Sequence, residues 1–460
     1  MLDSIPVEER TSIASFRWAI PLGFTAFLTS LSLLRYHLYL ATGWDLGFYE
    51  QGLWALSTHG PVTVSSWAGY PVLARSGAWI LLPLAYPYRL LGPDFLLILQ
   101  AFAYGAGFLY VMDLAEAWNT PWSSVRILGW VYLLSPVAWG AALFDFHPAF
   151  LAVPSLLASL AAAERGHSRA AVLWLALALL TQDLVALVVV LGGIALMLKG
   201  NRRAGLAAVG MGTLGVIANL VALHALDPRG FVQMATYVGP GESWFQQAAH
   251  NLVHQRAWLY LAWVLIPFLV FGVTRRSWFW LLPALMIVAL NVGSPLPAAT
   301  SPFTQYSILI LPALTVECLA AQSAGPVLGE RLRNGAMAVV IAFFGVYLFH
   351  QSAIRRQIPP RTQNLALEAA LKRVPPSAEV YCQNFVAPRV ANRNELHPIL
   401  AATVFPAGAY VVLDTGHSTG LAGLRLIRRD RMLLAPHSFT RYSSQGVYVL
   451  QMTATMKGAS

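Results

Sequence analysis

Apolar runs long enough to cross a lipid bilayer recur along this chain of 460 residues, and they constrain its fold more than any other feature. A helix needs about 20 residues to cross the hydrocarbon core, so each run of roughly 18 apolar residues or more is a candidate span. The runs are continuous, whereas the strands of a membrane β-barrel alternate apolar with polar residues. The sequence therefore predicts a mainly α-helical, multi-pass membrane protein.

The charged residues support this class and give the protein an orientation. Only 11% of the residues are charged, whereas soluble domains carry about 25%. The net charge is +10, but the lysines and arginines form short clusters between the apolar runs. Such clusters face the cytoplasm in multi-span proteins. We therefore expect a cytoplasmic N-terminus, contact with membrane lipids and no nucleic-acid partner.

Eleven membrane spans are predicted. With the N-terminus inside, the basic clusters between the spans fall on the cytoplasmic side. The apolar piece 77–91 is short and contains Pro83 and Pro87. We interpret it as an interfacial helix in the first outer loop, and a true span is the alternative. The predicted spans cover about residues 16–38, 94–115, 124–143, 148–164, 168–181, 184–198, 204–225, 257–273, 277–291, 303–320 and 335–352.

The chain divides into two predicted domains. Residues 1–354 form a transmembrane domain, in which 39–93 is the first extracytoplasmic loop with interfacial helices. Residues 355–460 no longer resemble spans: "LALEAALKRV" predicts a short amphipathic helix, and "YVVLD" and "GVYVL" predict strands. We therefore expect a small soluble α/β domain, on the extracytoplasmic side.

Few acids occur in the chain, yet several fall on the predicted outer side. Asp45 and Glu50 lie in "GWDLGFYEQGLW", Asp145 and His147 in "FDFHP", and Asp183 in "TQD". The orientation was assigned from lysine and arginine alone, so this gathering of acids is an independent observation. Charged side chains beside a membrane are costly and often mark functional sites.

Each of these residues also has a structural interpretation. Asp45 would cap a helix that begins near Leu46, with the neighbouring aromatic residues as an interfacial belt. Glu50 is five residues further on, so it does not share a helix face with Asp45, and we expect it to be solvated.

Two further acidic positions leave alternatives open. Asp145 precedes a Pro residue by three positions, a pattern typical of helix entry. Asp183 lies either at a corner between two short spans or within one long helix as a buried acid. The pair His250 and His254 has the spacing of metal ligands but lacks a third ligand, so a surface position is favoured.

Several motifs, in order, resemble a family of uncharacterised prokaryotic multi-pass membrane proteins related to the GT-C glycosyltransferases. They are "WDLGFYEQGLW", "FDFHPAFLAVP", "LALLTQDLVALVVVLGG", "SPFTQYSILILPAL" and "VPPSAEVYCQNFVAPRVANR". The resemblance implies a GT-C-type helix bundle in the prokaryotic cytoplasmic (inner) membrane. It also implies an inverting transfer of sugar from a polyprenyl-phosphate donor on the outer side. Asp45 matches the essential acid of the first loop, and Asp145 matches a second acid.

The sequence departs from that family at one place. Where related sequences tend to have Asp and His before the interfacial helix, "ARSGAW" has Arg75 and Ser76. A metal-binding or substrate-binding role of that pair would be altered or lost here. Arg75 would instead contact a lipid phosphate as a fixed cation. No set of metal ligands is predicted, and the resemblance leaves a divalent cation open.

The resulting hypothesis is a membrane glycosyltransferase. Its partners would be a polyprenyl-phosphate-linked sugar and an acceptor that is a glycan, a lipid or a protein. Asp45 would be the general base, because a carboxylate beside the membrane can accept the proton of a hydroxyl. The other candidates are Asp145 and His147 for orientation, Arg75, Arg89 and Arg256 for the phosphate, and Asp183, Gln305 and Tyr306 for further substrate contacts.

Two non-enzymatic alternatives remain. A lipid or solute transporter would explain Asp183 and a helix broken around it, because transporters place substrates at interrupted helices. A non-catalytic, lipid-binding relative that kept the fold would explain the change at Arg75 and Ser76.

Overall fold

The described part of the chain forms two compact units. The first comprises Met1–Leu31, Leu73–Leu81 and Leu97–Phe349, and the second comprises Ser32–Val72, Leu82–Leu96 and His350–Ser460. The computed structural model describes residues 7–58, 63–65, 69–227, 243–253, 255–269, 271, 273–302, 304–324, 335, 337–346, 360–416 and 421–459.

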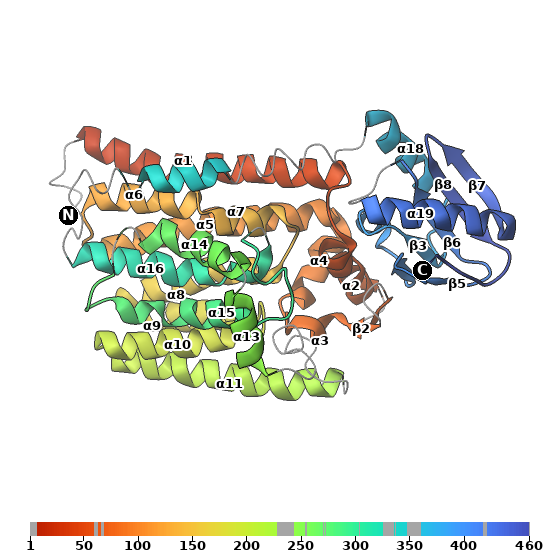
Figure 1. Ribbon diagram of the computed structural model, residues 1–460. Coiled ribbons are helices and arrows are strands. Elements are labelled where there is room, and N and C mark those ends of the chain that lie inside the picture. Colours follow the sequence, from red (N-terminus) through yellow and green to blue (C-terminus); the bar gives the residue numbers. More distant parts are fainter. Residues whose placement is uncertain are drawn as a thin grey trace. The chain divides into compact units, whose positions relative to one another are not determined.

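The first unit is a bundle of helices that run side by side (Figure 1). Its aromatic side chains pack edge to face, as in the contact between Phe24 and Trp139, whose ring centroids are 5.1 Å apart. Its longer helices are α1 (Val7–His37), α5 (Pro93–Ala117), α6 (Trp122–Leu133), α7 (Pro136–Leu143), α8 (Ala152–Glu164), α9 (Ser168–Leu179), α10 (Leu184–Lys199), α11 (Arg202–Leu226), α13 (Trp244–Val253), α14 (Gln255–Leu269), α15 (Leu282–Val292) and α16 (Ile310–Ser323). Shorter elements are α3 (Val72–Ser76), η4 (Pro148–Leu151), η5 (Trp278–Leu281) and η6 (Gln305–Ser307).

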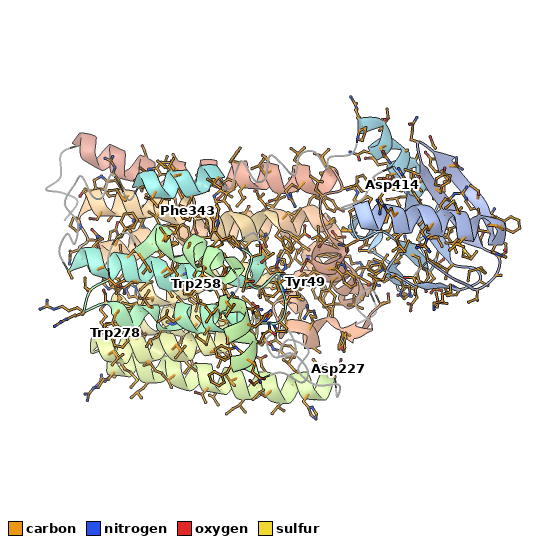
Figure 2. All side chains as sticks on the ribbon, viewed as in Figure 1. Tyr49, Asp227, Trp258, Trp278, Phe343 and Asp414 are labelled. Atoms are coloured by element: carbon orange, nitrogen blue, oxygen red, sulfur yellow. The ribbon has the colours of Figure 1, made fainter. Side chains whose placement is uncertain are left out.

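Large apolar side chains project outward from this bundle. Trp258 and Trp278 are 60% and 48% exposed, and both are labelled in Figure 2. Leu173, Leu206 and Leu214 are also exposed. A soluble protein rarely exposes so much apolar surface, whereas a membrane protein covers it with lipid. The bundle therefore has the surface of a membrane domain.

The predicted count of eleven spans is corrected by the lengths of the helices. Among the described residues, Ser15–His37, Pro93–Ala117, Trp122–Leu143 and Arg202–Leu226 are long and apolar enough to cross a membrane. A fifth span results if Trp244–Val253 and Ala257–Leu269, bent by 85°, count as one. Other predicted spans fold as helices of 10–17 residues. Even 17 residues rise only about 26 Å, less than the hydrocarbon core of about 30 Å.

The second unit contains the C-terminal sheet. Its strand order is β4-β3-β6-β8-β7, in which β3 is parallel to both β4 and β6, and β8 is antiparallel to β6 and β7. The elements are α18 (Arg361–Leu371), β3 (Val380–Cys382), η8 (Ala387–Val390), β4 (Leu396–Pro398), β6 (Tyr410–Asp414), α19 (Leu421–Leu434), β7 (Ser438–Ser444) and β8 (Val447–Met452), with β5 (Val404–Phe405) paired to β9 (Met456–Lys457).

Alternation along the strands explains why two helices cover this sheet. Cys382 and Val412 pack in one core with Leu367 of α18. Val411 packs in a second core with Ile427 of α19. Because successive side chains of a strand point to opposite faces, the helices α18 and α19 cover opposite faces. The predicted α/β fold of this segment is confirmed, and the predicted boundary at residue 354 lies outside the described residues.

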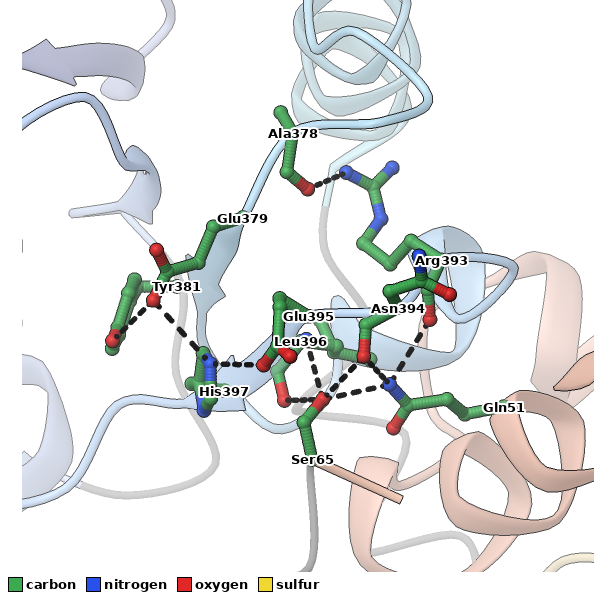
Figure 3. Close-up of polar contacts among 10 residues, drawn as sticks. All are labelled: Gln51, Ser65, Ala378, Glu379, Tyr381, Arg393, Asn394, Glu395, Leu396 and His397. Carbon is green, nitrogen blue, oxygen red and sulfur yellow. Dashed lines mark hydrogen bonds and ion pairs between the residues drawn. The ribbon is translucent and has the colours of Figure 1, made fainter. Parts of the chain in front are cut away.

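Elements of the first loop also belong to the second unit. They are η2 (Gly43–Gly47), α2 (Phe48–Thr58), β1 (Thr63–Val64), β2 (Tyr70–Pro71) and most of α4 (Leu81–Leu91). Figure 3 shows how they join the C-terminal segment: Gln51 Nε2 donates to the backbone oxygens of Arg393 and Asn394, at 3.1 and 3.0 Å. The Ser65 hydroxyl donates to Asn394 O at 2.9 Å and accepts from Leu396 N–H at 2.8 Å.

Candidate functional site

Asp45 lies in a π-helical turn of the second unit. The turn η2 spans Gly43–Gly47 and precedes α2 without a break. Gly47 N–H donates to Thr42 O at 3.1 Å, and the Thr42 hydroxyl donates to Asp45 Oδ2 at 3.1 Å. Single π-helical turns are rare and occur often at functional sites. Asp45 therefore lies inside a tight turn and not at a helix cap, because α2 begins at Phe48 instead of near Leu46.

Asn384, from the C-terminal segment, holds this turn through two acceptors. Gly43 N–H donates to Asn384 O at 2.8 Å, and Trp44 N–H donates to Asn384 Oδ1 at 3.1 Å. A Cβ atom at Gly43 would lie 2.6 Å from Ala387 Cβ, so only glycine permits this approach. The segment "CQNFVAP" carried only the family resemblance, and no pattern in it indicated that Asn384 positions the residues next to Asp45.

Glu50 is buried, with 1% of its surface exposed, so the prediction that it is solvated is wrong. Every residue from Phe48 to Leu53 is buried, which leaves this part of α2 without a solvated face. Burial raises the pKa of Tyr88 well above its usual range, and the nearby charge of Glu50 raises it further. Glu50 is thus part of the buried interior of the second unit.

Two arginines of the second unit have defined surroundings. The guanidinium of Arg389 lies over the rings of Tyr36 and Tyr39, with 4.8 and 5.5 Å to the centroids. Arg389 was not among the predicted site residues, although it lies in η8, which itself contacts η2. The predicted phosphate ligand Arg89 is exposed, and its Nη1 donates to Ser57 O at 3.1 Å, near the end of α2.

The "TQD" corner of the first unit joins α9 to α10, and the segment with Arg75 and Ser76 packs against it. Asp183 N–H donates to Ser76 O at 2.9 Å. Gly77 has a φ of +59°, and a Cβ there would lie 3.1 Å from Asp183 Cβ and 3.0 Å from Asn219 Oδ1. The interpretation of two helices meeting at a corner is therefore confirmed, because α9 ends at Leu179 and α10 begins at Leu184.

The surroundings of Asp183 at this corner shift the pKa of its carboxyl. Burial raises the pKa of Asp183 to about 7, while the Leu184 N–H donor and the positive charge of Arg75 oppose the rise. The Leu184 N–H lies 2.7 Å from Asp183 Oδ1. An acid at position 75 would add a like charge here, whereas Arg75 supplies the opposite charge. The structure thus brings together two predicted substrate ligands, and a perturbed carboxyl is a candidate functional group.

Asp145 and His147 are buried in the first unit, each 5% exposed. Gln100 of α5 fixes them: its Nε2 donates to Asp145 O at 2.8 Å, and its Oε1 accepts from His147 N–H at 2.8 Å. Asp145 has a φ of 136°, which non-glycine residues rarely adopt and which is common at functional sites. A helix does begin at Pro148, as predicted, but its N-cap position is His147 and not Asp145.

Gln305 and Tyr306 form most of the short turn η6. Asn291 Nδ2 donates to Tyr306 O at 3.3 Å and to the hydroxyl of Tyr260 at 2.8 Å, so the turn belongs to a buried polar network. The side chain of Arg256 and residue His254 lie outside the described residues. Within the described ranges, no three His, Cys, Asp or Glu residues are grouped to hold a metal ion.

The predicted site residues belong to both units. Asp45 and Arg89 are in the second unit, and Arg75, Asp145 and Asp183 are in the first. The prediction that Asp45 shares one pocket with Asp145 and Asp183 therefore stays a prediction. The contacts described above add Gln100, Asn384 and Arg389 to the candidate site residues.

Comparisons with known proteins give a family and a fold. A family model described as "Predicted membrane protein (DUF2079)" matches residues 35–408. The structure resembles that of ArnT from Cupriavidus metallidurans bound to undecaprenyl phosphate, with a TM-score of 0.56 and 15% identity over 93% of this chain and 98% of that chain. The apo structure of ArnT gives a TM-score of 0.54 and 14% identity over the same shares of the two chains. No curated protein matches. The likeness confirms the GT-C-type fold.

Proposed function

The chain belongs to the DUF2079 family of predicted membrane proteins, and from this premise we propose that it is a membrane glycosyltransferase. It would move a sugar from a polyprenyl-phosphate donor to an acceptor on the extracytoplasmic side. Support comes from the ArnT-like fold, since one ArnT structure contains undecaprenyl phosphate. The observation that carries the proposal is the turn η2, in which Asn384 and the Thr42 hydroxyl fix Asp45 and its neighbours.

The reaction fits an inverting displacement. The acceptor oxygen attacks the anomeric carbon as the bond from that carbon to the phosphate oxygen breaks. The proton of the acceptor hydroxyl passes to Asp45, and the polyprenyl phosphate leaves with the bonding electrons. Because the leaving group is already an anion, positioning and electrostatic stabilisation supply most of the catalysis.

Cationic side chains would hold the phosphate of the donor, and polar side chains would hold its sugar. Arg75, Arg89 and Arg256 were predicted for the phosphate, and Arg389 joins them because its guanidinium is already fixed over two tyrosine rings. A fixed guanidinium loses little freedom when it binds a phosphate in a bidentate manner.

The remaining candidates would contact the sugar or orient the other groups. Asp145 and His147 would help to orient the reacting groups, and Gln100 holds the backbone of both residues. Asp183, Gln305 and Tyr306 would bind the sugar. A divalent cation stays open as a cofactor.

The proposal includes a location and an orientation. The protein would lie in the cytoplasmic membrane of a prokaryote, with a cytoplasmic N-terminus. The second unit, which carries Asp45 and the C-terminal sheet, would lie on the extracytoplasmic side, where lipid-linked donors and water-soluble acceptors meet.

Replacement of Asp45 tests the assignment. Wild-type protein, the variant Asp45→Asn and the control Asp94→Asn would be purified in nanodiscs that carry the source membrane's lipids. Mass spectrometry would follow the disappearance of polyprenyl-phosphate sugars. We expect turnover by wild type and control, and none by Asp45→Asn, which should still retain the donor. Undiminished turnover by Asp45→Asn rejects the role of Asp45, and retention of ordinary phospholipid alone by all three proteins rejects the transferase.

A transporter is the second candidate, and one observation favours it. The corner between α9 and α10 holds an acid whose pKa is raised to about 7, and ionisable residues near the membrane interior often mark the substrate pathways of transporters. Transport would show as uptake of labelled lipid-linked sugar across vesicles without any chemical change. A lipid-binding relative without catalysis would show neither activity.

A further inference from the structure

A cavity of about 420 Å³ opens between α8, α9, α10, α11 and α16 of the first unit. Its walls are mainly apolar and include Leu160, Leu175, Val189, Met211 and Val316. The volume lies within the range of small-ligand pockets, about 300–1,000 Å³. An apolar chain is the type of ligand that such walls favour.

One end of the cavity is polar. Ser168 and Asn201 line it, and they lie at the starts of α9 and α11. An ion pair between Lys199 and Glu164 links the ends of α10 and α8 there. The N-terminus of a helix carries a partial positive charge, so two such ends favour an anion such as a phosphate. At α11 the Asn201 side chain already accepts from Ala204 N–H at 3.3 Å, and the other N–H groups of the first turn remain for a ligand.

Arginines reinforce the positive charge at this end. Arg203 lines the cavity, and Arg169 and Arg202 are exposed beside it. The nearby acids are already engaged, because Arg165 pairs with Asp113 at 3.2 Å and with Glu116 at 2.9 Å.

The described residues provide no ion-pair partner for Arg169, Arg202 or Arg203. The mouth of the cavity therefore carries positive charge that no described acid balances.

We infer that this cavity binds an anionic glycerophospholipid, with one acyl chain between the helices and the phosphate at Arg203. The predicted orientation gives this end to the cytoplasm, where lipid headgroups meet the basic clusters. A polyprenyl chain is branched along its length and has a far larger volume than this cavity.

The site is separate from the one proposed for sugar transfer. It lies at the opposite end of α10 from Asp183, and the 16 residues of α10 span about 24 Å. The inference shares the predicted orientation with the proposed function but does not depend on sugar transfer.

Two glycines provide a matched pair of variants. Gly192 lines the cavity, and a Cβ there would meet no atom within 4 Å. A Cβ at Gly210 of α11 would also meet nothing within 4 Å, but Gly210 does not line the cavity. Gly192→Leu should therefore fill the cavity without a clash, and Gly210→Leu should leave it open.

Native mass spectrometry of delipidated protein in detergent would measure the binding of phosphatidylglycerol, phosphatidylcholine and undecaprenyl phosphate. For the wild type and Gly210→Leu we expect one tight phosphatidylglycerol molecule, bound more tightly than phosphatidylcholine. Gly192→Leu should abolish this molecule. Arg203→Gln, a surface change that should not impair folding, should weaken it by about tenfold, the contribution of one charge-assisted hydrogen bond.

Three results would overturn the inference. They are equal binding of the two phospholipids by the wild type, unchanged binding by Arg203→Gln, and displacement of phosphatidylglycerol from the wild type by undecaprenyl phosphate. Because Arg203→Gln acts at the surface, the test stands even if Gly192→Leu fails to fold.

Discussion

The side chain of Asn384 accepts a hydrogen bond from the backbone N–H of Trp44 at 3.1 Å, although the two residues are 340 positions apart in the chain. The Asn384 backbone oxygen accepts a second one from Gly43. The C-terminal segment thus supplies part of the backbone hydrogen bonding of the turn that carries Asp45.

Replacement of Asn384 should loosen that turn. Asn384→Ala removes the Oδ1 acceptor of the Trp44 N–H hydrogen bond, at a cost of about 0.5–1.5 kcal/mol. Amide hydrogen exchange over residues 43–48 should quicken, while Asn384→Asp, which keeps an acceptor oxygen, should stay near wild type. Asn394→Ala is the control, since Gln51 and Ser65 contact only the backbone oxygen of Asn394. Equal exchange in Asn384→Ala and wild type would contradict the role of this side chain.

Gln100 should prove necessary for the Asp145–His147 segment. Gln100→Leu leaves Asp145 O without its Nε2 donor and His147 N–H without its acceptor, in a buried site. We expect a loss of about 0.5–1.5 kcal/mol for each of these two hydrogen bonds. Thermal unfolding in detergent measures it, with Gln182→Leu as a control at a more exposed glutamine. A melting temperature that falls no further than that of the control would argue against this role.

Asp183 should make stability depend on pH. Its pKa is raised from 3.8 to about 7 in the folded protein, so the folded state binds more protons than the unfolded state between these values. Stability from this group is therefore highest at low pH and falls as the pH rises through this window. Melting temperatures of wild type and Asp183→Asn between pH 4.5 and 8 should diverge, with the variant relatively more stable at the higher pH. Parallel curves would refute the assignment.

Gly77 should not tolerate a side chain. Gly77→Ala forces alanine into a φ of +59° and brings its Cβ within 3.1 Å of Asp183 Cβ. Gly92 has a φ of +70° but no atom within 4 Å of a Cβ, so Gly92→Ala measures the conformational cost alone. That cost is about 1 kcal/mol, and we expect Gly77→Ala to lower the melting temperature further. Equal losses in the two variants would mean that the contact with the corner is unimportant.

Local patterns predicted much of the fold. Apolar runs located the helices of the bundle because a helix that crosses a membrane needs about 20 apolar residues. Alternation in "YVVLD" and "GVYVL" located two strands because successive side chains of a strand point to opposite faces. The number of spans was wrong because runs that look alike in sequence fold as helices of 10–17 residues. Hydropathy does not reveal where a helix ends inside an apolar run.

The candidate site was predicted less completely, because its contacts are not local. Arg75 and Asp183 were singled out separately, and only the fold brings them together. Glu50 was expected in solvent because the helix pattern cannot show that the second unit encloses α2. Gln100 could have been found from the sequence, because it is a polar residue within the apolar run "LLILQAFAYG". Asn384 offered no such signal.

The dependence of the Asp45 turn on Asn384 has a consequence for biogenesis. The ribosome makes Asn384 after the helices of the bundle, so the nascent first loop lacks both of its distant acceptors until the C-terminal segment has been made. A chain cut short before Asn384 would insert its helices and still carry an incomplete turn. Formation of the Asp45 turn is thus tied to synthesis of the C-terminal segment.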